Sequence, residues 1–235
     1  MKSYWLQKKG RDDLIVFCSG WGMDQNPVLH MKSETFDVLT LWNYTDFDCQ
    51  VDFQELFSKY RSCTLVGWSM GVWAGQKLFS KFKSHLSRAI AINGTLCPID
   101  DHFGIPTAVY TSTQEQYSEQ TRLKFYKRMC RRKSILDTFL LRQPQRSVQD
   151  QIDELAVLKN SVNCLPARDS IYRDILISTR DLVVPTKNQV SFWQAKEDCK
   201  IILLDEAHYP FTTFDNWEQL MDMWLPGLPS SPAHQ

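Results

Sequence analysis

The most informative stretch of the sequence is Cys63-Thr64-Leu65-Val66-Gly67-Trp68-Ser69-Met70-Gly71-Val72-Trp73-Ala74-Gly75. Its apolar beginning, residues 63–66, predicts a buried strand, and apolar residues recur at helical spacing after Gly71. Between them, Gly67-x-Ser69-x-Gly71 predicts a tight turn with the serine at its apex, because a side chain at either glycine would collide with neighbouring backbone. The N-terminal end of the following helix favours negative charge, which suits a nucleophilic serine. The alternative is a serine that only caps a helix.

The composition predicts one compact domain of 235 residues with an inserted subdomain. The 27 basic and 27 acidic side chains balance, so the net charge gives no indication of nucleic-acid binding. We expect neither a signal peptide nor a transmembrane helix, since no run of about eighteen apolar residues occurs. The seven cysteines are scattered singly, without a C-x-x-C pair. This pattern favours reduced thiols in the cytoplasm over a disulfide framework or a zinc site.

Apolar, β-branched segments alternate with helical patterns along most of the chain. Strands are predicted at residues 14–19, 38–42, 63–66, 88–93, 171–178 and 200–204, with a further extended stretch at 107–110. Continuous apolar strands of this kind are typical of a mostly parallel central sheet covered by helices on both faces. We therefore expect a mostly parallel α/β fold with core segments at 1–113 and 166–225, an inserted helical lid at 114–165 and a disordered tail at 226–235.

A serine nucleophile needs a base, and the base needs an orienting carboxylate. In α/β-hydrolases these follow the serine in the order acid, then histidine, because each follows a later strand at the same edge of the sheet. Of the five histidines, only His208 directly follows a late strand. His30 precedes the serine, and His85 lies at the far end of its helix. His102 precedes the lid, and His234 lies in the tail. An ordinary loop histidine is the alternative interpretation of His208.

The predicted acid is Asp181, which lies just past the penultimate strand. Asp205 is a weaker candidate, because it and Glu206 are too close to His208 along one turn to orient its ring easily. Asp174 begins the strand at the opposite end. The predicted oxyanion donors are the backbone N–H groups of Trp21, in the loop after the first strand, and of Met70. Gly20-Trp21-Gly22 could also be only a tight turn with a core tryptophan.

With these pieces assembled, the sequence resembles the α/β-hydrolase superfamily, and within it the pimeloyl-acyl-carrier-protein methyl ester esterases of the BioG type. The matching pieces are Phe17-Cys18-Ser19-Gly20-Trp21-Gly22, Gly67-Trp68-Ser69-Met70-Gly71-Val72-Trp73, Ala91-Ile92-Asn93-Gly94-Thr95, Pro98-Ile99-Asp100-Asp101 and Ala207-His208-Tyr209-Pro210-Phe211. They span residues 14 to about 215. One departure from many hydrolases is Ser19-Gly20 in the oxyanion loop, where His-Gly is common.

The resemblance implies hydrolysis of the methyl ester of a pimeloyl chain carried by acyl carrier protein, in biotin biosynthesis. Ser69 would attack the ester carbonyl with His208 as base, and methanol would leave. No metal and no organic cofactor is implied. The protein is expected to act as a cytoplasmic monomer, without nucleic-acid or membrane partners.

A basic segment supports a carrier-protein partner, since no acidic residue occurs between Glu119 and Asp137. On a helix, Leu123, Tyr126, Met129 and Cys130 form the inner stripe, and Lys124, Lys127, Arg128 and Arg131 face outward. We expect Lys124, Lys127, Arg128, Arg131 and Arg132 to dock the acidic carrier protein, with Arg142 and Arg146 as an extension of the patch. A merely solvated face, or a contact with phosphate or RNA, is the alternative.

Two other functions remain open from the sequence. One is a different serine hydrolase on the same fold, such as a thioesterase, lipase or carbon–carbon hydrolase. The other is a non-catalytic binder that keeps the pocket.

Overall fold

The computed structural model describes residues 1–225 and contains one seven-stranded sheet in the order β1-β3-β2-β4-β5-β6-β7. The strands are β1 Lys2–Gln7, β2 Asp13–Cys18, β3 Phe36–Trp42, β4 Ser62–Trp68, β5 Arg88–Ile92, β6 Asp174–Ser178 and β7 Lys200–Leu204. All neighbouring pairs are parallel except β1 and β3. The mostly parallel sheet that the sequence predicts is therefore confirmed. The antiparallel edge strand β1 was not predicted, because its first three residues are exposed and Lys2, Ser3 and Gln7 leave only a short apolar run.

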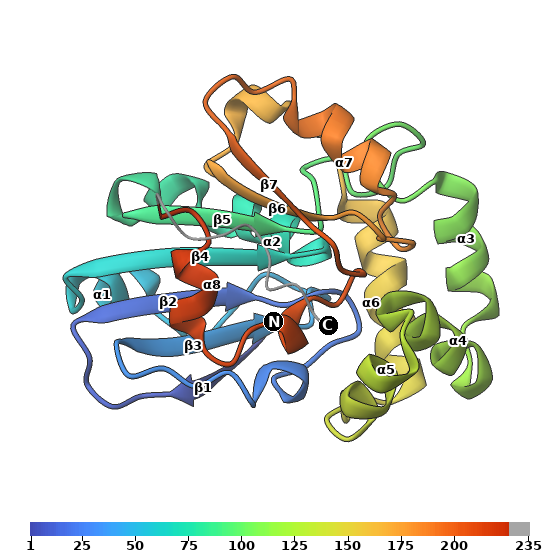
Figure 1. Cartoon of the computed structure of the whole chain (residues 1–235), viewed down its shortest axis with the longest axis horizontal. Coiled ribbons are helices and arrows are strands. Elements are labelled where there is room, and N and C mark those ends of the chain that lie inside the picture. Colours follow the sequence, from blue (N-terminus) through green and yellow to red (C-terminus); the bar gives the residue numbers. More distant parts are fainter. Residues whose placement is uncertain (226–235) are drawn as a thin grey trace.

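Helices cover both faces of the sheet. They are α1 Phe53–Ser58, α2 Met70–Phe79, α3 Thr107–Gln116, α4 Glu119–Cys130, α5 Lys133–Leu140, α6 Val148–Ser161, α7 Thr186–Trp193 and α8 Trp217–Asp222, with short 3-10 turns η1 Asn26–Val28, η2 Ser80–His85, η3 Ala167–Asp169 and η4 Phe211–Thr213. Figure 1 shows α8 in front of the sheet and α1 and α2 behind it. Within residues 1–225, no helix combines the length and the apolarity that crossing a lipid bilayer would require.

The two faces of the sheet have separate apolar cores, and β2 contributes to both. Ile15 and Phe17 belong to the cluster around Trp68 and Phe211, whereas Leu14 and Val16 belong to the cluster on the opposite face. All four side chains are completely buried. A strand covered on both faces needs apolar residues at every position, which explains the continuous apolar run in the sequence.

Helices α3 to α6 lie between β5 and β6 in the chain and gather beyond the carboxyl ends of the strands, in green to yellow at the right of Figure 1. We call these four helices the helical insertion. The expectation of an extended stretch at 107–110 is wrong, because Thr107–Gln116 is helical. The β-branched Thr107 and Val109 favour a strand locally. Tertiary contacts override this preference, since Tyr110 is buried and its hydroxyl donates to the carbonyl of Leu155 on α6.

One prediction about the cysteines is also wrong. Cys97 and Cys164 form a disulfide, with their Cα atoms 4.1 Å apart. They are separated by 67 residues, so their spacing carries no recognisable pattern, and the fold alone brings them together. The backbone hydrogen bond from Leu165 to Leu96 places the two segments side by side. The remaining five cysteines are free thiols. The predicted disordered tail at 226–235 lies outside the described residues.

Candidate active site

Ser69 lies at the turn between β4 and α2, in a backbone conformation that the flanking glycines make possible. Its φ of 55° and ψ of −123° are rare for a residue with a side chain. A Cβ atom added at Gly71 would lie 2.0 Å from the carbonyl oxygen of Cys18, and one at Gly67 would lie 2.8 Å from Cα of Val72. Neither contact is possible between real atoms, so the two glycines are required for this turn.

The three side chains predicted as nucleophile, base and acid are brought together by the fold. The Ser69 hydroxyl lies 2.9 Å from Nε2 of His208, and Nδ1 of His208 lies 2.7 Å from Oδ2 of Asp181. With Nδ1–H donating to the carboxylate, Nε2 is left free to accept the proton of the serine hydroxyl. All three residues are at least nine-tenths buried. This is the geometry that general-base activation of a serine requires.

Asp181 is held rigidly at the start of the loop after β6. Its Oδ1 accepts hydrogen bonds from the backbone N–H groups of Val183 and Val184, at 2.8 and 3.0 Å. Its Oδ2 accepts a further hydrogen bond from the side chain of Gln189 at 2.9 Å, in addition to that from His208. These donors keep the carboxylate aimed at the imidazole.

The other acidic candidates are engaged elsewhere. Asp205 pairs with Arg180, Glu206 with Arg132, and Asp174 with Arg88 at the opposite end of its strand.

The loop that carries His208 is fixed by two buried donors. Nε1 of Trp68 donates to the carbonyl oxygen of His208 at 2.9 Å, and the side-chain amide of Asn93 donates to the same oxygen at 3.0 Å. Trp68 is the last residue of β4 and Asn93 directly follows β5, and both lie within motifs that carry the family resemblance. Among the other histidines, His30 contacts the carbonyl of Phe211 and His85 contacts Gln54. His234 lies outside the described residues.

Trp21 and Met70, the predicted oxyanion donors, both line the cavity beside Ser69. Within residues 1–225 the backbone N–H of Trp21 has no hydrogen-bond acceptor. Met70 is the first residue of α2, where a backbone N–H has no partner inside the helix. Two unused donors next to the serine are suited to stabilise a negatively charged oxygen.

A buried network from α6 fixes the oxyanion loop, and the sequence did not predict it. The carboxylate of Glu154 accepts from the backbone N–H groups of Gly22 and Tyr44, at 3.0 and 2.7 Å. Arg146 pairs with Glu154 at 2.6 Å and also donates to the carbonyl of Met23. Glu154 is completely buried and Arg146 is 8% exposed, so the expectation that Arg146 extends a surface patch is wrong.

Sequence signals for this network exist but are weak. Arg146, Asp150 and Glu154 follow one another at four-residue spacing, and Glu154 directly precedes the apolar Leu155. Gln151 of the same helix accepts from Nε1 of Trp21 through its backbone carbonyl and donates to the carbonyl of Gly22 through its side chain. Arg146, Gln151 and Glu154 therefore act together on one loop.

A narrow cavity opens beside Ser69 and is lined mainly by apolar side chains. Its lining consists of Gly20, Trp21, Met23, Trp68, Ser69, Met70, Ile105, Tyr110, Thr113, Phe125, Arg128, Met129, Leu155, Val183 and His208. An apolar chamber with the serine and imidazole in its wall suits an aliphatic acyl chain. Within the described part of the chain, no group of three or more His, Cys, Asp or Glu side chains could hold a metal ion.

Comparison with known proteins assigns the family. Residues 1–220 match the family described as pimeloyl-ACP methyl esterase BioG. The chain belongs to the BioG family. The crystal structure of BioG from Haemophilus influenzae is similar, with a TM-score of 0.82 and 31% identity over 94% of this chain and 99% of that one. Family membership identifies the chain as a carboxylic ester hydrolase and confirms the expected α/β-hydrolase fold.

The chain is also similar in fold to one further solved structure and in sequence to one further protein. An esterase from Exiguobacterium antarcticum shares the fold, with a TM-score of 0.70 at 15% identity over 94% of this chain and 92% of that chain. A protein of Bacteroides fragilis named malonyl-[acyl-carrier protein] O-methyltransferase is 36% identical over 199 residues. The match covers 85% of this chain but only 40% of the Bacteroides fragilis protein.

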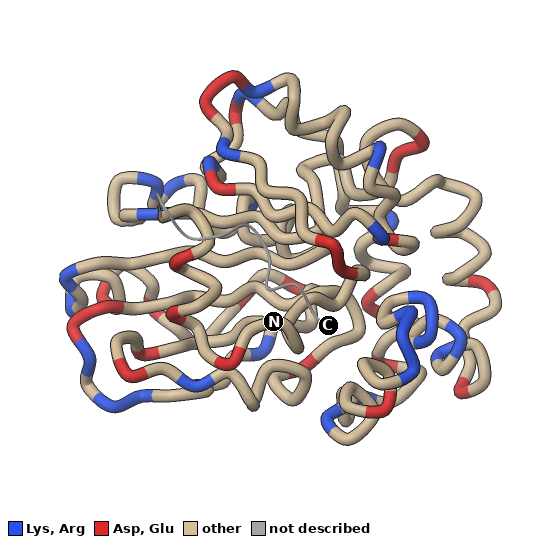
Figure 2. The backbone as a smooth tube through the Cα atoms, in the orientation of Figure 1, with Lys and Arg blue, Asp and Glu red and all other residues tan. Residues whose placement is uncertain are grey.

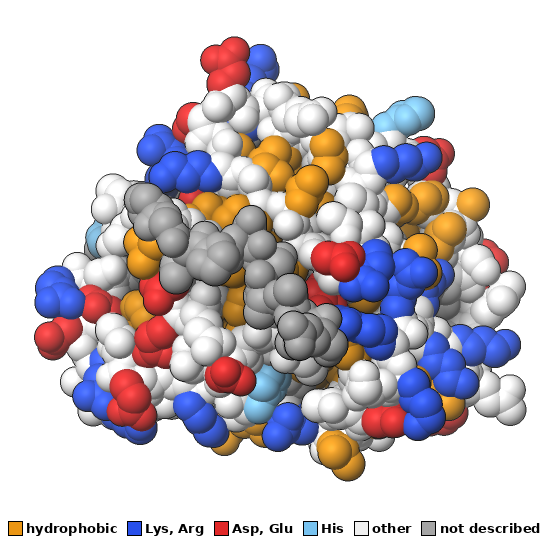
Figure 3. Space-filling model, in the orientation of Figure 1, with side chains coloured by type: hydrophobic (Ala, Val, Ile, Leu, Met, Phe, Trp, Pro, Cys, Tyr) orange, Lys and Arg blue, Asp and Glu red, His pale blue; other side chains and the backbone are white. Residues whose placement is uncertain are grey.

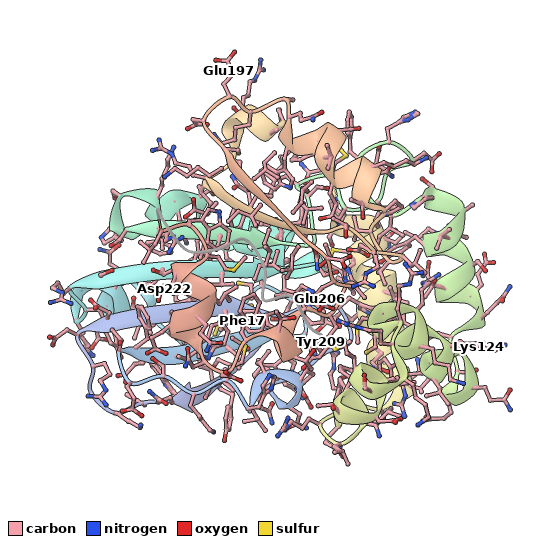
Figure 4. All side chains as sticks on the ribbon, in the orientation of Figure 1. Phe17, Lys124, Glu197, Glu206, Tyr209 and Asp222 are labelled. Atoms are coloured by element: carbon pink, nitrogen blue, oxygen red, sulfur yellow. A yellow bond between two sulfur atoms is a disulfide. The ribbon has the colours of Figure 1, made fainter. Side chains whose placement is uncertain are left out.

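The basic residues of the predicted docking patch lie on α4 and between α4 and α5. Figures 2 and 3 show a concentration of blue at this part of the helical insertion. Lys124, Lys127 and Arg131 are exposed. Lys124 projects away from the sheet in Figure 4, whereas Glu206 lies where the sheet meets the helical insertion.

Two members of the predicted patch differ from the expectation. Arg128 is half-buried and lines the catalytic cavity, so it does not simply face outward. Arg132 pairs with the buried carboxylate of Glu206, two residues before His208.

The apolar stripe of α4 also differs from the expectation. Leu123 was expected in the inner stripe but is 40% exposed. Phe125 lines the cavity instead.

Proposed function

We propose that the chain hydrolyses the methyl ester of pimeloyl-acyl carrier protein to pimeloyl-acyl carrier protein and methanol, in biotin biosynthesis. The observation that carries the proposal is the buried Ser69–His208–Asp181 chain in the wall of an apolar cavity, within a chain of the BioG family. The cavity takes the aliphatic chain, and the ester carbonyl reaches the serine.

In the proposed mechanism, Nε2 of His208 removes the proton of the Ser69 hydroxyl as its oxygen attacks the ester carbonyl. The backbone N–H groups of Trp21 and Met70 stabilise the negative charge on the carbonyl oxygen. Collapse of the tetrahedral intermediate breaks the bond to the methoxy group, which takes a proton from His208 and leaves as methanol. Water, deprotonated by His208, then attacks the acyl-serine, and the pimeloyl carboxylate is released with Ser69 regenerated.

We further propose that the exposed cations Lys124, Lys127 and Arg131 dock the carrier protein, because acyl carrier proteins are strongly acidic and a basic surface attracts them. The Bacteroides fragilis relative is named for a carrier-linked substrate, which supports a carrier-protein partner. We propose a monomer that acts in the cytoplasm without nucleic-acid or membrane partners and without a cofactor.

The test is methanol release from methyl pimeloyl-acyl carrier protein by the purified protein. The parent should release methanol, and Ser69→Ala should reduce kcat by about 10⁶. Release of the carrier thiol in place of methanol would identify a thioesterase and contradict the proposal. Hydrolysis of p-nitrophenyl esters that is reduced less than about tenfold in Ser69→Ala would contradict the assignment of the nucleophile.

A further inference from the structure

The side chain of Arg128 is unusual among the arginines around the catalytic cavity. Arg122, Arg132 and Arg146 each pair with a carboxylate. Arg128 makes no hydrogen bond or ion pair to any other residue within 1–225, and its Nε is buried without a partner. Burial lowers the pKa of the guanidinium, but it remains charged. Its guanidinium lies 5.8 Å from the centre of the Phe125 ring, and the charge of Asp181 acts on it, but neither group accepts a hydrogen bond from it. The buried Nε–H of Arg128 therefore still lacks an acceptor, and leaving such a donor unpaired is costly.

Arg128 also lies where two cavities meet. Together with Thr113 and Phe125 it lines both the catalytic cavity and an outer groove of about 500 Å³ between α3 and α4. The groove is more polar than the catalytic cavity and contains the side chains of Ser112, Gln116, Tyr117, Thr121 and Lys124. We call the three residues that line both spaces the neck; it lies between an apolar chamber and a groove that is more polar than the chamber.

The polarity of a carrier-linked diacid monoester increases along its length in the same order, from the ester end to the carrier end. Its ester end and methylene chain are apolar, and the far end of the chain is a thioester carbonyl. Beyond this carbonyl follows an amide-containing pantetheine arm. If the ester lies at Ser69 and the methylenes fill the chamber, the thioester carbonyl is the acceptor that reaches the neck.

We infer that Arg128 is a specificity-determining residue that donates a hydrogen bond to the thioester carbonyl oxygen at the far end of the acyl chain, with the pantetheine arm in the groove between α3 and α4. This inference rests on the proposed function. It separates Arg128 from Lys124, Lys127 and Arg131, which would contact the carrier protein. Arg128 then selects esters that have a second carbonyl at the correct chain length.

The test uses small substrates, so that docking of the carrier protein plays no part. Methyl pimeloyl-pantetheine thioester is compared with methyl heptanoate, which has the same chain length but no far carbonyl. Arg128→Met should lower kcat/KM for the thioester by about 10- to 150-fold, the typical effect of a hydrogen bond to a charged group. Methyl heptanoate hydrolysis should stay within about twofold of the parent. Arg128→Lys, which keeps a charged donor, should recover part of the loss.

The matched control is Lys159→Met, which removes an exposed charge on α6 that lines neither cavity. It should leave both small substrates unaffected. Equal losses of Arg128→Met on both substrates would show a structural role and overturn the inference. A loss seen only with the carrier-bound substrate would place Arg128 in the docking surface instead. A larger loss with monomethyl pimelate than with the thioester would identify a carboxylate as the ligand.

The parent protein separates this inference from the proposed function. If it hydrolyses methyl heptanoate but releases no methanol from methyl pimeloyl-acyl carrier protein, the proposed substrate is wrong and the inference fails with it. If it releases methanol normally and Arg128→Met leaves thioester hydrolysis unchanged, only the inference about Arg128 is wrong.

Discussion

Replacement of Glu154 by glutamine should weaken both the fold and the oxyanion loop. The carboxylate accepts two backbone N–H groups and pairs with Arg146, and it is completely buried. A glutamine has nearly the same shape but only one acceptor oxygen, so its NH₂ group must face a donor. The substitution therefore leaves at least one buried donor without a partner.

The expected magnitude follows from these contacts. Removing one partner of a buried ion pair costs about 3–5 kcal/mol. Arg146 keeps its second partner, Asp150, at 2.6 Å, which places the cost near the lower limit, about 3 kcal/mol. For a urea dependence of about 3 kcal/mol/M, the midpoint of unfolding should fall by about 1 M. Loss of a single oxyanion donor typically reduces kcat by about 10²–10³. The loss of kcat in Glu154→Gln should not exceed this range, because at most the N–H of Trp21 is displaced.

The assay combines urea unfolding with esterase kinetics at low urea, where the variant is still folded. Asp153→Asn is the matched control, because this neighbouring acid on α6 is exposed and, within residues 1–225, its side chain hydrogen-bonds only to Gln149. The control should unfold at the parent midpoint and keep full activity. A Glu154→Gln midpoint within about 0.3 M of the parent, together with unchanged kcat, would refute the role of Glu154.

Three further predictions concern other parts of the molecule. Arg132→Met should reduce kcat equally for carrier-bound and small esters, because Arg132 pairs with Glu206 beside His208; a loss confined to the carrier-bound substrate would instead support docking. Thiol titration of the unreduced protein in denaturant should give five thiols, and seven after reduction, whereas seven in both cases would exclude the Cys97–Cys164 disulfide. Burial lowers the pKa of His30, so protonation favours the unfolded chain. Stability should therefore fall as the pH drops below about 6.5, and His30→Gln should flatten this dependence in urea titrations at several pH values.

The elements that the sequence predicted are those whose physical requirements are local. The turn at Ser69 needs glycines two residues away on either side, and Ser69 is the only serine in the sequence that meets that requirement. His208 and Asp181 could be located because each follows a strand with an apolar run, and parallel strands bring their carboxyl ends to one edge. The order along the chain was therefore sufficient for the arrangement of these three residues.

The features that were missed depend on contacts between distant segments. Glu154 resembles an ordinary surface acid of a helix until the fold places it against Gly22 and Tyr44. Helical periodicity assigned Arg128 to the outer face, but the packing of α3 beside α4 turns that face into the wall of a groove. The disulfide joins residues on either side of the helical insertion, and spacing cannot reveal such a pair.

The helical insertion contributes residues to both halves of the catalytic apparatus. α6 supplies Glu154 to the oxyanion loop, and the turn after α4 supplies Arg132 to the loop of His208. A swinging motion of all four helices would therefore break the Arg132–Glu206 ion pair and the hydrogen bonds from Gly22 and Tyr44 to Glu154, and would disorganise the machinery it uncovers. Substrate entry should instead proceed by a smaller displacement of α3 against α4. For the same reason, exchanging these helices with those of another hydrolase should inactivate the enzyme rather than merely change its substrate.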